Sequence, residues 1–226
     1  MKFVPVLLVI LLVGCSSIQK PKDPIQVDLR ATRLTVGSVQ GVFNTFSAVG
    51  TTTENIQVSY YPQDNVVCLT IRHNFTTFYQ FWDKDNREIY LKALDQYKQD
   101  YEQRNLKKSN MSTRRNYGVV QGYLIWESTT ISGQSFSYPN IELGYQFKNN
   151  APYFSVNMRE ADNTSEITKN EPALQQNTTL CIYLTRALAD DLAALLDENV
   201  LQSFARGVRE LPKDKEVQQD VYEEKQ

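Results

Sequence analysis

The architecture is indicated most clearly by the stretch Ile56-Gln57-Val58-Ser59-Tyr60-Tyr61-Pro62-Gln63-Asp64-Asn65-Val66-Val67-Cys68-Leu69-Thr70-Ile71. Residues Ile56 to Tyr60 alternate apolar and polar side chains, which is typical of a strand with one buried face. Pro62 to Asn65 predicts a turn, because proline suits its first position and Asp and Asn suit its later positions. Val66 to Ile71 is apolar and β-branched and predicts the returning strand, so the stretch forms an antiparallel hairpin.

Strand patterns continue on both sides of this hairpin. A second hairpin is predicted from the two alternating runs that flank Lys148 to Pro152. The remaining β-like segments are Val27 to Val49, Phe75 to Trp82, Val119 to Trp126 (broken by Gly122), Ile141 to Phe147, Tyr153 to Met158 and Leu180 to Leu184. The chain is therefore rich in strands.

Two segments have helical spacing instead. Asp85 with Glu88 predicts a capping box, and an apolar stripe at intervals of three and four residues follows it over about 86–105. Thr185 predicts the cap of a second helix over about 186–206, and Gly207 predicts its end. The stripes are Tyr90, Leu94, Tyr97 and Tyr101 in the first helix, and Leu188, Leu192, Leu195 and Leu196 in the second. The sequence predicts an α+β fold, an antiparallel sheet with two helices packed on one face.

Composition limits the function classes. The chain of 226 residues has a formal net charge of −2, and 22% of its residues are charged and 11% aromatic. These values are typical of a folded protein and give no general case for binding nucleic acid. We expect one globular domain over 25–211 and a polar tail over 212–226.

The N-terminus has the features of an export signal. Lys2 supplies a positive charge, and Phe3 to Val13 forms an apolar run that is too short to span a bilayer as a helix. The run ends in Leu12-Val13-Gly14-Cys15. An ordinary signal peptide with a chance cysteine is the simpler alternative.

This ending resembles that of a bacterial lipoprotein precursor. The resemblance covers residues 1–15 and implies removal of 1–14 and attachment of acyl chains to Cys15. It implies a membrane partner through the lipid anchor, with 15–24 as a tether, because two or more chains hold a protein durably at a bilayer. Ser16 follows the cysteine, where retention in the inner membrane usually needs Asp, so the resemblance favours the outer membrane of a cell envelope.

Cys68 and Cys181 lie in strand-like runs, and export would place them where a disulfide can form. The alternative is that both are buried and reduced. A metal site is not expected, because His73 is the only histidine and the cysteines are scattered. We predict no cofactor. His73 could serve in catalysis, but a polar group at a strand end is the simpler interpretation, and no catalytic motif accompanies it.

Two surface features remain open. A basic segment without an acid, formed by Arg104, Lys107, Lys108, Arg114 and Arg115, could contact an anion, although a solvated loop explains it as well. Trp82 and Trp126, with Tyr79, Phe81 and Tyr123, could line a sugar or peptide site, although aromatic residues in strands more often form core.

The sequence favours a membrane-anchored envelope lipoprotein with a non-enzymatic domain that binds or supports another envelope protein or a glycan. An anchored hydrolase or glycan-processing enzyme, built on scattered carboxylates or on His73, is the alternative. A carrier with an apolar internal cavity is a third hypothesis.

Overall fold

The computed structural model describes residues 24–44, 51–108, 116–148 and 150–207. One long helix and two short ones accompany a ten-stranded sheet. The strands are β1 (Leu34–Asn44), β2 (Thr51–Tyr61), β3 (Val66–His73), β4 (Thr76–Trp82), β5 (Asn116–Gln121), β6 (Tyr123–Ser128), β7 (Gln134–Ser137), β8 (Asn140–Lys148), β9 (Ala151–Met158) and β10 (Leu180–Leu184). The helices are α1 (Lys84–Glu102), α2 (Arg186–Leu196) and α3 (Glu198–Ala205), with a short 3-10 turn η1 (Pro172–Leu174).

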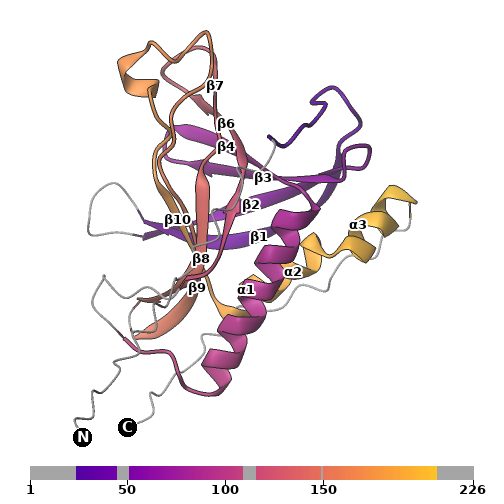
Figure 1. Ribbon diagram of the computed structural model, residues 1–226, viewed down its shortest axis with the longest axis vertical. Coiled ribbons are helices and arrows are strands. Elements are labelled where there is room, and N and C mark those ends of the chain that lie inside the picture. The colour runs from indigo at the N-terminus through magenta and orange to yellow at the C-terminus, as the bar shows by residue number, and fades with distance from the viewer. Residues whose placement is uncertain (1–23, 45–50, 109–115, 149, 208–226) are drawn as a thin grey trace, which may run out of the picture.

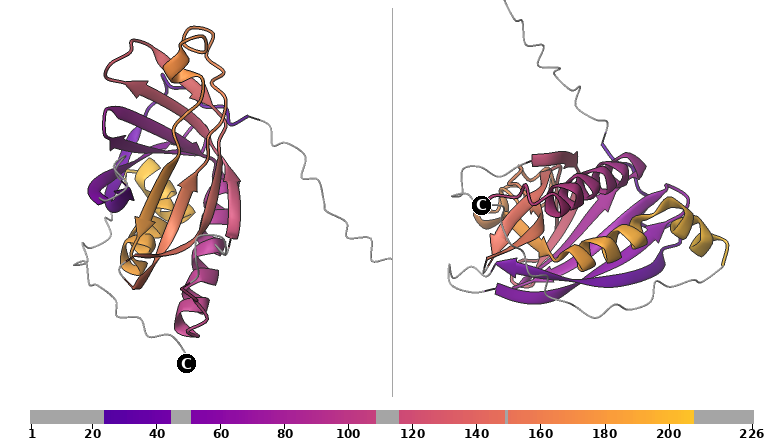
Figure 2. Two further views of the ribbon diagram at one scale, coloured as in Figure 1. Left: turned by 90° about the vertical axis from the view of Figure 1, so that its left-hand side faces the viewer. Right: turned by 90° about the horizontal axis from the view of Figure 1, so that it is seen from below.

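The sheet has the order β5-β8-β9-β10-β1-β2-β3-β4-β6-β7, and every neighbouring pair is antiparallel. It curls strongly, so that β8, β9 and β10 run at a steep angle to β1, β2 and β3 (Figure 1). The predicted α+β class is confirmed at this level, with the sheet as the dominant part. Figure 2 shows the curl from two further directions, with α1 and α2 alongside the strands.

Both predicted hairpins are confirmed. In the first, Val58 on β2 pairs with Leu69 on β3, and Asn65 in the turn has a positive φ of 51°. Asparagine tolerates this left-handed conformation better than most residues. In the second, Leu143 on β8 pairs with Val156 on β9. Each hairpin is therefore built from local signals that the sequence displays.

The predicted strand Val119 to Trp126 is two strands with distant partners. β5 pairs with β8, whereas β6 pairs with β4 and β7. Gly122 lies between them and donates its N–H to the Pro139 carbonyl oxygen at 3.2 Å. A Cβ atom at this position would lie 3.1 Å from the Ile141 Cδ1 atom. The chain passes here from one end of the sheet to the other because the curl brings those ends close together.

Helix α1 begins earlier than the sequence indicated. Asp83 is its N-cap and accepts a hydrogen bond from the Asn86 N–H at 3.0 Å, so the predicted capping box of Asp85 and Glu88 is wrong. Asp85 already lies in the first turn of α1, whereas Asp83 has the extended backbone that a cap requires. The predicted stripe is confirmed as core at Tyr90, Leu94 and Tyr97, and Tyr101 packs against that core.

The predicted helix over 186–206 is broken at Asp197. This residue has φ −63° and ψ 131°, outside the helical region, and it separates α2 from α3. Its carboxylate accepts hydrogen bonds from the N–H groups of Asn199 and Val200 and so caps α3. The leucine spacing alone did not reveal this second start.

Two hydrophobic cores hold the sheet. The larger one includes Trp82 and Trp126 together with side chains from all three helices, so the core interpretation of these tryptophans is confirmed. The smaller core joins Cys68 and Phe81 to the segment that begins with Ile25. Tyr79 and Tyr123 are partly buried against it. Ile25, Val27 and Ala31, which precede β1, therefore pack on the sheet.

Candidate functional site

A pocket of about 330 Å³ lies where several strands end. β1, β3 and β9 finish beside it, and β4 and β10 begin there. Its lining residues come from segments that are far apart in the sequence: Asn44, His73, Thr76, Phe78, Asn157, Arg159, Thr178, Thr179, Leu180, Cys181 and Tyr183. The volume is at the lower end of the range for small-molecule sites.

His73 is held in a fixed position at this pocket. Its Nδ1 atom lies 2.9 Å from Glu54 Oε1, and its Nε2 atom lies 3.0 Å from the backbone oxygen of Asn44. The ring stacks on Phe43 with centroids 5.3 Å apart, and the residue is only 7% exposed. Both ring nitrogens are therefore used by the protein itself.

The two contacts of His73 constrain the proton between it and Glu54. A backbone oxygen only accepts, so Nε2 must carry a hydrogen, and Nδ1 faces a carboxylate oxygen. The hydrogen bond between Nδ1 and Glu54 Oε1 therefore needs a further proton, either on the imidazole or on the carboxyl group. The other oxygen of Glu54, Oε2, is buried without a hydrogen-bond partner among the described residues. His73 and Glu54 therefore form a hydrogen-bonded polar pair within the sheet.

Arg159 follows β9 at the pocket. Its Nη2 atom donates to Glu142 Oε2 at 2.6 Å, and this hydrogen bond raises the pKa of Arg159 although partial burial opposes it. Its backbone is fixed at both ends, since the N–H donates to Asn140 O at 2.9 Å and the carbonyl accepts from Asn177 Nδ2 at 2.9 Å. A positive charge is therefore positioned at the rim of the site.

Of the two alternatives that the sequence left open for Cys68 and Cys181, the disulfide is not formed and both cysteines are free. Cys68 lies on β3 and Cys181 on β10, and β1 and β2 lie between these strands. Three strand spacings amount to about 14 Å, which is beyond the reach of a disulfide. Burial raises the pKa of Cys68 to about 11, whereas Cys181 is partly exposed at the pocket. The two thiols therefore have different environments.

The basic segment is only partly described. Arg104, Lys107 and Lys108 are exposed just after α1, and Arg114 and Arg115 lie outside the described residues. The Lys107 N–H donates to the hydroxyl oxygen of Tyr145 at 3.3 Å, and Lys108 donates to the side chain of Asn150. These contacts hold the start of the segment along the second hairpin. Cys15 also lies outside the described residues.

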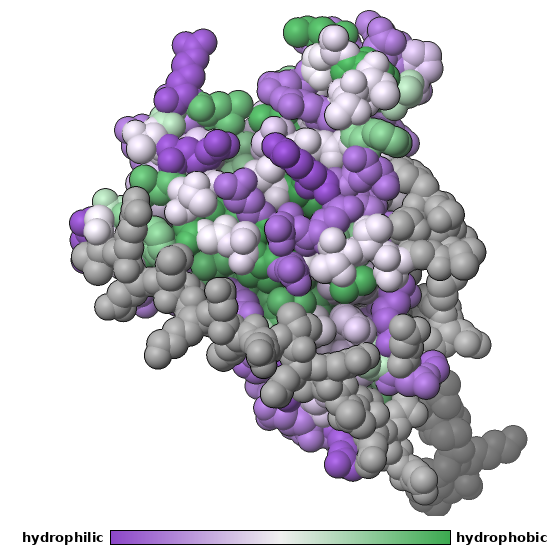
Figure 3. Space-filling model, turned by 180° about the vertical axis from the view of Figure 1, so that it is seen from behind, coloured by the Kyte–Doolittle hydropathy of each residue, from purple (hydrophilic) through white to green (hydrophobic). Residues whose placement is uncertain are grey.

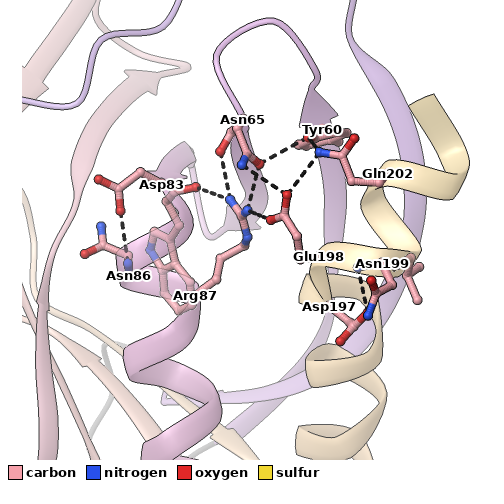
Figure 4. Close-up of polar contacts among 11 residues, drawn as sticks. Tyr60, Asn65, Asp83, Asn86, Arg87, Asp197, Glu198, Asn199 and Gln202 are labelled. Carbon is pink, nitrogen blue, oxygen red and sulfur yellow. Dashed lines mark hydrogen bonds and ion pairs between the residues drawn. The ribbon is translucent and has the colours of Figure 1, made fainter. Parts of the chain in front are cut away.

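A second polar cluster, which we call the Arg87 network, was not predicted. Arg87 is 2% exposed and donates to Glu198 Oε2 at 2.6 Å and to Asn65 Oδ1 at 2.8 Å (Figure 4). Gln202 donates to Glu198 Oε1 at 3.0 Å and to the Tyr60 hydroxyl at 3.1 Å. The network ties the first hairpin, α1 and α3 together. A signal was present, because Arg87 precedes Tyr90 by three residues and so lies on the buried stripe.

Among the described residues, no group of three or more His, Cys, Asp or Glu side chains is arranged to hold a metal ion. Within the same residues, no helix has the length and apolar character needed to cross a bilayer. The face opposite to that of Figure 1 mixes hydrophilic and hydrophobic residues in its described part (Figure 3). The pocket is a concave site, formed by described residues, that could hold a small ligand.

A family model described as an uncharacterised Treponema protein matches residues 32–203. The chain belongs to this family. No curated protein and no solved structure matches the chain. The match to the Treponema family includes all ten strands and every lining residue of the pocket, and it leaves Cys15 outside. The matched region therefore covers the curled sheet, α1, α2 and most of α3.

Proposed function

We propose that this chain is a lipid-anchored protein of the bacterial cell envelope whose folded domain binds a small polar ligand in the strand-end pocket. The observation that carries the binding role is the pocket itself, in which the cation of Arg159, amides and hydroxyls surround about 330 Å³. The anchor rests on the sequence Leu12-Val13-Gly14-Cys15. The outer membrane is the expected location, and an envelope protein or a glycan remains the proposed partner class beyond the ligand.

The contacts of His73 support binding over catalysis. A general base needs a ring nitrogen within hydrogen-bond reach of the substrate or of a nucleophile. Both nitrogens of His73 already face Glu54 and the Asn44 carbonyl at 2.9 and 3.0 Å. The imidazole therefore supports the wall of the site.

The fold proposal extends to the placement of the helices. We propose that α1, α2 and α3 lie on one face of the sheet, as the sequence pattern suggests. Tyr90, Leu192 and Leu201 support this, because they come from the three helices and join one core cluster with the inner residues of the strands.

The anchor is tested by changing Cys15. In wild-type cells the protein should partition with membranes, and mass spectrometry should find acyl chains on the cysteine at a new N-terminus. The Cys15→Ala variant should move to the soluble fraction. A variant that stays with the membranes, or an unmodified wild-type N-terminus, would contradict the anchor.

The pocket is tested separately, by native mass spectrometry of the protein purified from its own membranes. We expect a small bound molecule in the wild type and none in Thr179→Trp, because the indole of this exposed lining residue would fill the site. Gln175→Trp, also exposed but outside the lining, is the matched control and should keep the molecule. Equal occupancy in both variants would contradict the proposed site.

A hydrolase remains the second candidate because Cys181 places a partly exposed thiol in the lining of the pocket. A thiol can act as the nucleophile in acyl transfer, and His73 would have to give up one of its two hydrogen bonds to serve as the base. Turnover of an ester panel that Cys181→Ser abolishes would favour this candidate. Binding without turnover would favour the non-enzymatic role.

A further inference from the structure

We infer that the ligand of the strand-end pocket is a small organic carboxylate, and that Arg159 is the group that selects it. The inference rests on the proposed binding function and names its ligand class. Among the described lining residues, only Arg159 and His73 have side chains that can carry a full positive charge, and none is Asp or Glu. Their carboxylate partners, Glu142 and Glu54, lie outside the lining. The balance of the wall therefore favours an anion.

The guanidinium of Arg159 has more N–H donors than its contact with Glu142 uses. A guanidinium group has five N–H donors in a planar fork, which fits the two oxygens of a carboxylate. The contact with Glu142 uses Nη2. Its two backbone hydrogen bonds fix the base of the side chain, so a ligand meets a positioned cation. Glu142 lowers the cost of holding this charge when the pocket has no ligand.

The remaining wall indicates the body of the ligand. Thr178 and Thr179 supply hydroxyls, and Asn157, which is 8% exposed, supplies an amide. Phe78 and Leu180 supply apolar surface. A ligand with a carboxylate and a compact, partly apolar body matches this mixture. A lipid chain does not, because polar side chains such as those of Asn157, Thr178 and Arg159 are mixed with the apolar ones in the lining.

A carboxylate fits better than a phosphate. Phosphate sites usually combine several cations or the N–H groups at the start of a helix. The nearest helix in the sequence, α2, begins after Leu184, at the opposite end of β10 from Leu180. One arginine with neighbouring amides and hydroxyls is the simpler match for a planar anion.

The test compares benzoate, benzamide and inorganic phosphate as probes of the full lipidated protein in detergent micelles, with affinities measured by ligand-observed NMR. We expect benzoate to bind at least tenfold more tightly than benzamide, and phosphate to bind more weakly than benzoate. Arg159→Gln should remove the preference for benzoate. Glu142→Gln is the control, because it also removes the ion pair between Glu142 and Arg159 but keeps the positive charge of Arg159. This variant should still prefer benzoate to benzamide.

Each other outcome counts against the inference. Equal affinity for benzoate and benzamide, stronger binding of phosphate, or an unchanged preference in Arg159→Gln would overturn the carboxylate assignment and leave the pocket intact as a binding site. Failure of all three probes to bind would also overturn the carboxylate assignment, while the comparison of Thr179→Trp with Gln175→Trp decides separately whether the pocket binds a molecule.

Discussion

Arg87 on α1 and Glu198 on α3 form a hydrogen-bonded ion pair of 2.6 Å although they are 111 residues apart in the chain. Arg87 is almost fully buried, whereas the Glu198 side chain is 34% exposed. The same guanidinium also donates to the backbone oxygens of Asn65 and Trp82 at 2.9 and 3.3 Å. This pair therefore joins the last helix to the first hairpin.

We expect Glu198→Gln to lower the free energy of unfolding by about 2 kcal/mol, because it replaces charge-assisted hydrogen bonds and leaves a buried guanidinium without a counter-charge. Urea denaturation measures the change. The control is Glu166→Gln, which removes a pair between Lys169 and a carboxylate that is 84% exposed. A surface pair of this kind contributes less than about 1 kcal/mol. Equal losses in the two variants would contradict the role of the Arg87 network.

The same pair predicts a dependence on pH. Burial raises the pKa of Glu198, but hydrogen bonds from Gln202, Arg87 and Asn65 and the charge of Arg87 lower it more, so its pKa lies below the ordinary value of 4.5. A group with a lowered folded pKa contributes stability that is present above pH 4.5 and is lost as the pH falls through the folded pKa. We expect the difference in unfolding free energy between wild type and Glu198→Gln to shrink below pH 4.5. A difference that stays constant down to acid unfolding would exclude this linkage.

The two cysteines of the domain should react at different rates. Cys68 is completely buried and its pKa is raised to about 11, so few molecules expose a thiolate at a pH of about 8. Cys181 is partly exposed. We expect iodoacetamide to label Cys181 in the native protein and Cys68 only after denaturation, as read by peptide mass spectrometry. A disulfide-linked peptide, or faster labelling of Cys68, would refute this description.

Gly41 should be intolerant of even one added carbon. A Cβ atom there would lie 2.9 Å from Ile182 Cγ2 and 3.1 Å from Ile56 Cδ1, at the place where β10 meets β1. Overpacking of a core typically costs about 1–3 kcal/mol, so we expect Gly41→Ala to lower the melting temperature by several degrees.

Ser38→Ala on the same strand is the control for Gly41→Ala, because Ser38 lies nearer the surface. It should leave the melting temperature nearly unchanged. If Gly41→Ala were equally mild, the close contact between β10 and β1 would not limit the sheet.

Local patterns predicted much of the fold. The alternation around Val58, the turn at Asn65 and the spacing of Tyr90, Leu94 and Tyr97 each depend on neighbours within a few residues, and each was confirmed. The predicted break at Gly122 is also present. The sequence did not predict that the strands on either side of it pair with different partners. The choice of partners depends on the curl of the whole sheet.

The candidate site was less accessible to prediction. His73 was noted as the only histidine, but its contacts with Glu54 and Asn44 require β1, β2 and β3 to be side by side. Arg159 and Thr179 lie in no recognisable sequence motif, so the sequence did not indicate a site at these residues. The sequence left open whether Cys68 and Cys181 form a disulfide, because apolar strand patterns do not give the order of the strands, and the structure shows both cysteines free.

The sequence by itself determined the strand and helix patterns, the first hairpin and the expectation of an anchor at Cys15, because hydrophobic period, turn preference and a signal-like N-terminus are properties of short segments. Only the tertiary structure decided which strands are neighbours, that Arg87 meets Glu198, and that a pocket forms between residues as distant as Asn44 and Tyr183. These relationships depend on how the sheet twists and closes its core, and that is a property of all ten strands together.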